Sequence, residues 1–247
     1  MPRILLVALA ALALAPATAH ARPGDPDRDF GRRGTVTLRA TGADAVGGAV
    51  RVLERNRILV GGAAIGQFVI VKLRPSGSLD SSFGTRGQVV PALPGSSLEG
   101  VRALATFRDG RIVAGGTLTL ANGTTRMVVL RLLPSGEIDP SFGGGLGYQF
   151  VGPVDAHLAS MVMDRDGNVI VGGGRRTSSG GEAPIVIKLL ADGTPDPTFD
   201  GDGLVDVAVL GLSGRATSLL ARADGTVTFT VGPGAEAVGA ATFYTVR

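Results

Sequence analysis

Histidine chemistry has a single candidate in this chain. The sequence contains two histidines, and His20 lies in an apolar N-terminal segment, which leaves His157 as the possible general base. A Ser-His-Asp site also needs a serine on a sharp turn, typically within Gly-x-Ser-x-Gly. The nearest match, at Ser213, has Arg215 in place of the final glycine. We therefore predict no catalytic residue, and we interpret His157 as a residue of a solvated loop.

Aspartate-rich stretches are the candidates for metal binding. One stretch holds four aspartates with glycines between them: Asp196, Asp200, Asp202 and Asp206. Such oxygen-rich loops bind Ca²⁺, which takes about six to eight oxygen ligands, but the bidentate glutamate of a full calcium loop is missing here. A second partial match spans residues 164–168. Because cysteine is absent and histidine is scarce, a zinc site also lacks ligands. We predict that these aspartates form turns, and we predict no metal and no cofactor.

An acid and a base recur at matching positions along the chain. The acids are Asp27, Asp80, Asp139 and Asp196, and the bases are Lys72, Arg131, Lys188 and Arg247. A residue present in every copy serves the shared architecture, so we interpret the acid as an acceptor of backbone N–H bonds in a turn. The base is then expected to pair with an acid or a carbonyl between neighbouring sheets. Function is expected where the copies differ, in the loops 91–100, 117–126, 152–157 and 174–183.

Four repeats carry these residues. A phenylalanine follows each acid by three residues, and the phenylalanines recur about every 53 to 59 residues, a period typical of repeat architectures. They are Phe30, Phe83, Phe142 and Phe199, and we expect each to be buried between neighbouring repeats. A second landmark, an apolar run that ends in paired glycines, keeps step at residues 57–62, 111–116 and 168–173. We assign the repeats to residues 23–76, 77–135, 136–192 and 193–247.

Each repeat is predicted to hold four short strands. The first follows the phenylalanine, at residues 35–38, 88–90, 148–151 and 204–207. Asp-Gly between later apolar runs predicts tight hairpins, because glycine takes a positive φ without steric cost; Asn56 replaces it in the first repeat. The last two strands are nearly continuous apolar runs, which indicates that both faces of the sheet are covered.

Such sheets, repeated four times, predict an all-β protein, a β-propeller of four four-stranded antiparallel blades. An open array of blades and half of a dimeric eight-bladed ring remain open as alternatives. Composition agrees, because 39 glycines argue against long helices. The chain has 24 Lys+Arg and 21 Asp+Glu with no extended basic block, which argues against a nucleic-acid partner.

The N-terminus has the pattern of a secretory signal. Arg3 precedes an apolar run over residues 4–15, and Ala19-His-Ala21 follows. The run is too short to anchor the chain in a membrane. We expect residues 1–21 to be a signal peptide and residues 22–247 to form a single propeller domain, with no transmembrane segment after cleavage. The protein is then exported to a periplasm, a cell surface or the extracellular space.

The second and third repeats resemble the delta-60 repeat. The resemblance rests on residues 103–116, ALATFRDGRIVAGG, and residues 129–143, VLRLLPSGEIDPSFG. It covers about residues 23–247 and implies a bacterial β-propeller of a mostly exported family without an assigned activity. It carries over no catalytic residue.

Two functions follow as hypotheses. The first is an exported, non-catalytic propeller that binds an extracellular protein or polymer through its variable loops, as a monomer or homodimer. The alternative is an extracellular hydrolase or lyase with paired carboxylates in the channel of the propeller.

Overall fold

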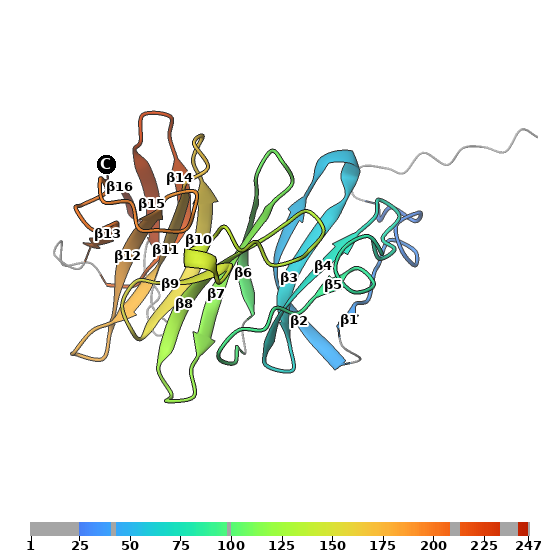
Figure 1. The fold of residues 1–247 in the computed structure, drawn as a ribbon, viewed down its shortest axis with the longest axis horizontal. Helices are drawn as coiled ribbons and strands as arrows, with labels where there is room; N and C mark the ends of the chain where they lie inside the picture. Colours follow the sequence, from blue (N-terminus) through green and yellow to red (C-terminus); the bar gives the residue numbers. More distant parts are fainter. Residues whose placement is uncertain (1–24, 41–42, 98–99, 208–212, 233–241, 247) are drawn as a thin grey trace, which may run out of the picture.

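The chain forms four antiparallel sheets that follow one another along the sequence (Figure 1). The computed structural model describes residues 25–40, 43–97, 100–207, 213–232 and 242–246. The first sheet contains β1 (Arg39–Ala40), β2 (Ala43–Val52), β3 (Ile58–Ala64), β4 (Gln67–Leu73) and β5 (Gln88–Val89). The second contains β6 (Val101–Thr106), β7 (Ile112–Thr119), β8 (Thr125–Leu132) and β9 (Tyr148–Val151). The third contains β10 (Ala156–Met163), β11 (Val169–Arg176), β12 (Glu182–Leu189) and β13 (Leu204–Asp206). The fourth contains β14 (Arg215–Ala221), β15 (Val227–Gly232) and β16 (Thr242–Val246).

The all-β propeller class predicted from the sequence is confirmed. The helical elements among the described residues are two short 3-10 turns, Glu54–Asn56 and Gly143–Gly145. The two central sheets have four strands each; the first has the short β1 in addition, and the described part of the fourth has three. The strand that begins each repeat completes the sheet of the repeat before it, so that β5, β9 and β13 pair with β4, β8 and β12.

One predicted strand is not formed. Residues 35–38 pair with no sheet: Thr35 bridges to Gly31, and β1 begins afterwards at Arg39 as the short arm of a hairpin with β2. The equivalent strands β5, β9 and β13 form because each lies along the outer strand of a preceding sheet. Residues 35–38 instead pack against the first sheet through Val36 and Leu38.

The hairpin turns have the conformations that the sequence predicts. Gly110, Gly167 and Gly225 have φ values of 86°, 84° and 84°. In the first repeat Arg55 and Asn56 both adopt the left-handed conformation, with φ of 57° and 55°. Each turn joins the innermost strand of a sheet to the next strand, and it therefore fixes the register of the ladder.

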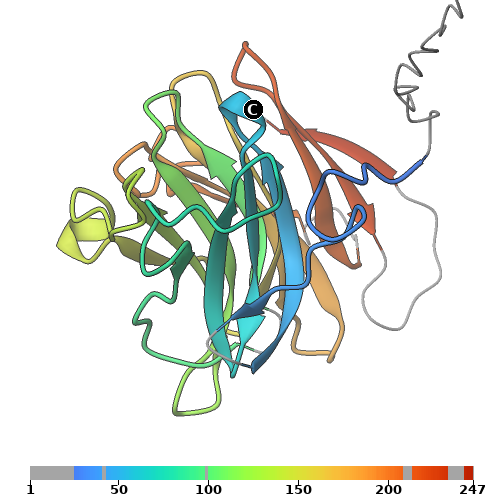
Figure 2. The same cartoon turned by 90° about the vertical axis from the view of Figure 1, so that its right-hand side faces the viewer.

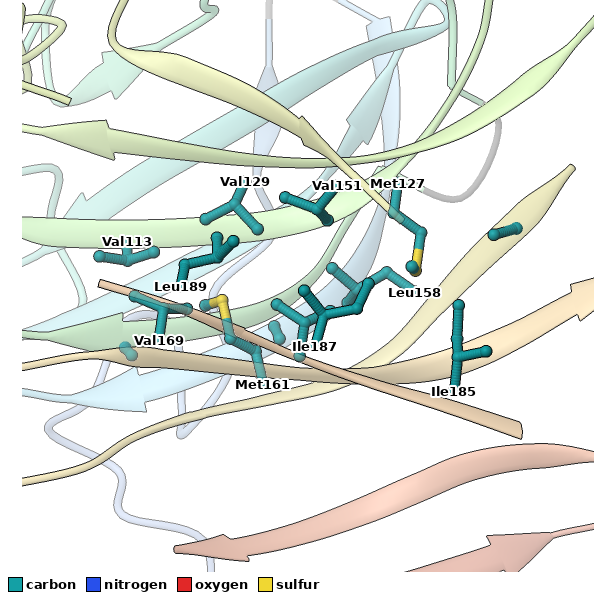
Figure 3. Packing of buried hydrophobic residues seen from close by; sticks show 14 of the residues in the cluster. Val113, Met127, Val129, Val151, Leu158, Met161, Val169, Ile185, Ile187 and Leu189 are labelled. Atoms are coloured by element: carbon teal, nitrogen blue, oxygen red, sulfur yellow. The ribbon is translucent and has the colours of Figure 1, made fainter. Parts of the chain in front are cut away.

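Four apolar clusters form the core, three of them between neighbouring sheets. The largest joins the second sheet to the third and includes Val129 and Met127 on one side and Met161 and Ile187 on the other (Figure 3). Two more join the first sheet to the second and the third to the fourth. The last cluster lies on the face of the first sheet that has no sheet beside it, and the N-terminal segment covers part of it.

Three of the four repeat phenylalanines are buried between sheets as predicted. Phe83 and Phe142 are fully buried, and Phe199 is 3% exposed. The prediction for Phe30 is wrong, because its side chain is only half-buried at the uncovered face of the first sheet. Its turn is formed, but no sheet of the described residues covers its other side.

Close approach of neighbouring sheets depends on one glycine in each of β3, β7 and β11. We call Gly61, Gly115 and Gly172 the notch glycines. A Cβ atom on Gly61 would lie 2.6 Å from Val101 Cγ1 and 3.3 Å from Leu104 Cδ1 of the next sheet. The same contacts join Gly115 to Leu158 and Met161, and Gly172 to Ala216 and Leu219. The innermost strand of each later sheet thus inserts a pair of apolar side chains beside a notch glycine, and we call these pairs the knobs.

The predicted signal segment, residues 1–21, lies outside the described residues. Among the described residues, no helix is long and apolar enough to cross a membrane.

Candidate functional site

The innermost strands of all four sheets border one hollow. Its volume is about 640 Å³, and its lining includes Arg51 from β2 and Leu220 from β14. The hairpin turns after β6 and β10 supply the rest of its polar lining, with residues 107–109 and 164–167. We call it the central hollow. It lies at the end of the innermost strands where the chain turns into the next strand. The turns after β6 and β10 therefore also line the site.

Three arginines supply the positive charges of the central hollow. Arg51, Arg108 and Arg165 come from three different sheets, and each is exposed. Within the described part of the chain, no ion pair or hydrogen bond is recorded for their guanidinium groups. A guanidinium offers five N–H donors in a planar fork suited to carboxylate, sulfate and phosphate groups.

Two of the nearby carboxylates are already engaged. Asp109 accepts the backbone N–H of Arg111 at 3.0 Å and its Nε–H at 2.7 Å. Those bonds from Arg111 lower the pKa of Asp109 below its ordinary value of 3.8. Asp164 accepts the backbone N–H groups of Asp166 and Asn168 and the side-chain amide of Asn168. These two aspartates close their turns, as the sequence predicts.

The aspartates of the calcium-like stretch are dispersed. Asp196 pairs with Lys188, Asp202 accepts the backbone N–H of Leu204, and Asp206 pairs with Arg175 at 2.6 Å. No group of three or more histidine, cysteine, aspartate or glutamate side chains is gathered for a metal ion among the described residues. The stretch therefore builds a turn and two ion pairs.

The recurrent acid and base form an ion pair in two of the three repeats in which both are described. Arg131 and Asp139 are both buried, and Nε donates to Oδ2 at 2.7 Å. Lys188 lies 2.8 Å from Asp196, whereas Lys72 stands over the ring of Phe83, 5.4 Å from its centre. Asp80 pairs instead with Arg57, whose Nε lies 3.5 Å from Oδ2.

Each recurrent acid also holds the turn that carries the phenylalanine. Ser82, Ser141 and Thr198 donate both a backbone N–H and a hydroxyl to Asp80, Asp139 and Asp196, in that order. The interpretation of the acid as a turn acceptor is confirmed. Arg247, expected as the fourth base, lies outside the described residues. The ladder places Thr245 at the position that Lys72 has in the first sheet. Thr245 pairs with Thr228 in the register in which Lys72 pairs with Leu59.

These acids predict a loss of stability in acid. Hydrogen bonds from Ser82 lower the pKa of Asp80. Burial raises the pKa of Asp139 and Asp196, but hydrogen bonds from Ser141 and from Lys188 outweigh it, and both pKa values fall below 3.8. A folded-state pKa below the unfolded value stabilises the fold above that value, and the contribution is lost as pH falls through the folded pKa.

We therefore expect the free energy of unfolding, measured in urea, to change little from about pH 7 to 5 and to fall below about pH 4. Single Asp→Asn variants at positions 80, 139 and 196 serve as controls, because each should flatten the acid limb. A stability that rises between pH 5 and 3 would contradict the assignment.

His157 lies in a strand and not in the predicted loop. It belongs to β10, is half-buried and stands opposite Gly174 in β11. The prediction of a solvated loop is wrong because β10 begins at Ala156, inside the predicted loop of residues 152–157. The side chain does not line the central hollow.

The arginines of the central hollow were not predicted from the sequence. Function was expected in the variable loops, and the turns after β6 and β10 were interpreted as structural. A signal was present, because Arg108 and Arg165 both precede the Asp-Gly of their turns. Arg51 has no such signal, since it is brought to the hollow only by the packing of the first sheet.

Comparison with known proteins supports a β-propeller repeat family. A family model described as "Domain of unknown function (DUF5122) beta-propeller" matches residues 56–83, 108–142 and 165–199. The three matched segments each run from a hairpin turn to a repeat phenylalanine, in the first, second and third sheets. No curated protein shows significant sequence similarity to the chain.

Two solved structures are similar in fold. One is a GH43 β-xylosidase/α-arabinofuranosidase from a compost microbial metagenome, in complex with xylotriose; the identity is 10%, the TM-score 0.40, and the match covers 82% of this chain and 77% of that one. The other is Drosophila plexin A in complex with semaphorin 1b, with 10% identity, a TM-score of 0.38 and 81% of this chain covered. This chain matches 40% of the plexin chain. Neither protein's activity transfers to this chain at such similarity.

Proposed function

We propose that this chain is an exported, non-catalytic β-propeller that binds an anionic extracellular polymer or protein at its central hollow, and that its repeats are delta-60 repeats. Export is supported by the signal pattern of residues 1–21, and the repeat type by residues 103–116 and 129–143. The observation that carries the binding site is that three arginines from three sheets line one hollow.

The electrostatics of the hollow favour an anion. Three arginines and three aspartates line the hollow. Asp109 is paired with Arg111 and Asp164 accepts the hydrogen bonds of its own turn, so Asp166 is the one lining acid without such a bond in the described structure. The three arginines therefore outnumber the acids that are not already engaged. Hydrogen bonds between guanidinium and carboxylate or sulfate contribute about 1.5–3 kcal/mol each when they form well. Phe107 is no platform for a stacked base, because Arg111 lies over its ring at 4.5 Å from the centre. A carboxylated or sulfated chain therefore fits the site better than a nucleic acid.

The test uses polygalacturonate and dextran sulfate as probes, titrated calorimetrically at low and high salt. We expect the Arg108→Ala/Arg165→Ala variant to bind the preferred probe at least about tenfold more weakly. The matched control is Arg86→Ala/Arg176→Ala, which removes two exposed charges that do not line the hollow. Equal weakening in both variants would show charge attraction without a site, and no binding of either probe would overturn the proposal.

A hydrolase is the second candidate, since Asp109, Asp164 and Asp166 line the same hollow. A general acid needs a raised pKa, whereas the hydrogen bonds from Arg111 lower the pKa of Asp109. Release of new reducing ends from the bound polymer, abolished by Asp166→Asn, would favour this candidate and displace the first.

A further inference from the structure

The N-terminal segment repeats the phenylalanine turn of the later repeats in atomic detail. Phe30 N donates to Asp27 O at 3.1 Å and Gly34 N to Phe30 O at 2.8 Å, as Phe83 N does to Asp80 O at 3.0 Å and Gly87 N to Phe83 O at 2.8 Å. Gly31 N bonds Ser76 O of the first sheet, as Gly84 N bonds Ser135 O of the second. Residues 27–36 thus mark the place of a sheet that would precede the first.

In the later repeats this turn is held by the outer strand of the preceding sheet. Lys72 in β4 donates its N–H to Gly87 O at 3.0 Å and accepts from Asp80 N at 2.8 Å. The equivalent groups of the N-terminal turn are Gly34 O and Asp27 N. No partner is recorded for either group in the described part of the chain, and Phe30 beside them is half-buried.

The fourth sheet offers the matching edge. Its outermost described strand, β16, pairs with β15 only, whereas β4, β8 and β12 each carry a further strand. Thr245 occupies the position of Lys72 in the ladder. By the same register Thr35 falls opposite Tyr244, as Gln88 stands opposite Val71. An unpaired edge of this kind is a template for another strand.

The side chains of the two faces are also matched in size. The knobs of the first sheet, at the positions of Val101 and Leu104, are Gly47 and Val50. Both are smaller than their counterparts. The notch position of the fourth sheet holds Thr230 in place of a glycine. The smaller side chains of the first sheet would therefore pack against the larger Thr230 of the fourth sheet. The distance between the two sheets would then stay close to that of the other pairs.

The knob face of the first sheet is open to solvent. Val50 is 69% exposed, whereas its counterparts Leu104 and Met161 are 8% and 7% exposed. Val46 and Val52 on the same strand are also more than half exposed. An apolar hollow of about 310 Å³ lies between this sheet and residues 36–38 of the N-terminal segment. Figure 2 shows this segment, drawn in dark blue, beside the first sheet.

We propose that a second copy of this chain covers the face: the fourth sheet of one copy packs on the first sheet of the other, and residues 35–38 of the other pair with β16. The first and fourth sheets of one chain stand at opposite ends of the molecule (Figure 1), and β2 and β14 make no extensive contact in the described structure. Two such head-to-tail contacts close a symmetric ring of eight sheets. The contact does not depend on the ligand of the central hollow.

Cross-linking tests the register and the source of the strand, because the chain has no cysteine. Thr35→Cys and Tyr244→Cys are made in separate chains, mixed and oxidised. We expect a disulfide-linked heterodimer, since the pair falls where Cα atoms stand within disulfide reach. Thr35→Cys mixed with Asn122→Cys, at a distant hairpin tip, is the control and should stay unlinked. Linkage of the pair only when both cysteines share one chain would show closure within a chain and overturn the proposal.

The mass of the protein in solution tests whether a second copy covers the exposed face of the first sheet. The unmodified protein is expected to show twice the mass of one chain by light scattering, and Val50→Arg to shift it to one chain with its circular dichroism unchanged. Val154→Arg, which alters another valine that is more than half exposed, in the loop between β9 and β10, should remain a dimer. A monomeric unmodified protein at high micromolar concentration, or a Val50→Arg variant that stays dimeric, would contradict the proposal.

Discussion

Replacing Asp139 by alanine should reduce the free energy of unfolding by about 3–5 kcal/mol, the usual cost of removing one partner of a buried ion pair. Arg131 is 2% exposed, and its Nε bonds Asp139 at 2.7 Å. Its other nitrogens donate to Ser141 Oγ and to the carbonyl of Ala191 in the next repeat. Without Asp139 the cation stays buried with its charge uncompensated, and the turn at Ser141 loses its acceptor. Urea unfolding followed by circular dichroism measures the loss.

Two further variants separate the causes. Asp109→Ala removes an exposed acid that pairs with Arg111, and such surface pairs contribute about 0–1 kcal/mol. Arg131→Met combined with Asp139→Ala removes the stranded charge, so the double variant should be more stable than Asp139→Ala alone. A double variant that is less stable than the single one would show that the pair acts through packing.

The sequence predicts most of the fold because the repeat constrains it four times over. The Asp-Gly turns, the paired glycines and the phenylalanine turns all lie where their spacing places them. The register of β16 could not be predicted in this way. The pattern of an apolar run ending in a cation points to Arg247, but the ladder is fixed by the hairpin before β15, and it puts Thr245 at that position. The position of one cation therefore predicts the register of a strand less well than the turn that begins its hairpin.

The candidate site was predicted less well because it depends on where strands converge. Arg108 and Arg165 sit in turns whose residues are explained by turn geometry alone, and nothing in the sequence brings Arg51 near them. The exposure of Val50 is hidden for a similar reason, since its repeat counterparts are buried. A repeat pattern predicts the environment of a position only when both neighbouring sheets are present, and in the described structure the first sheet has a neighbour on one side only.

Truncation of Phe142 to alanine gives the second large effect, an expected loss of about 3–5 kcal/mol in the free energy of unfolding. The ring is fully buried between the second and third sheets. It lies against Gly193 of the next repeat, where an added Cβ would come within 2.7 Å of its Cζ, and under the guanidinium of Arg131 at 4.9 Å. Alanine would remove the ring from beneath a buried cation and leave a cavity between two sheets. The cavity would not close, because the hydrogen bond from Gly143 N to Asp192 O holds the backbone on both sides in place.

The matched control lies in the same turn. Leu146 is 62% exposed, so Leu146→Ala should change the free energy of unfolding by no more than about 0.5 kcal/mol. Phe142→Leu should recover part of the loss, because it refills most of the volume. A loss below about 1 kcal/mol for Phe142→Ala would mean that the sheets re-form their contact without the ring. The repeat phenylalanine would then mark a turn and not the junction between sheets.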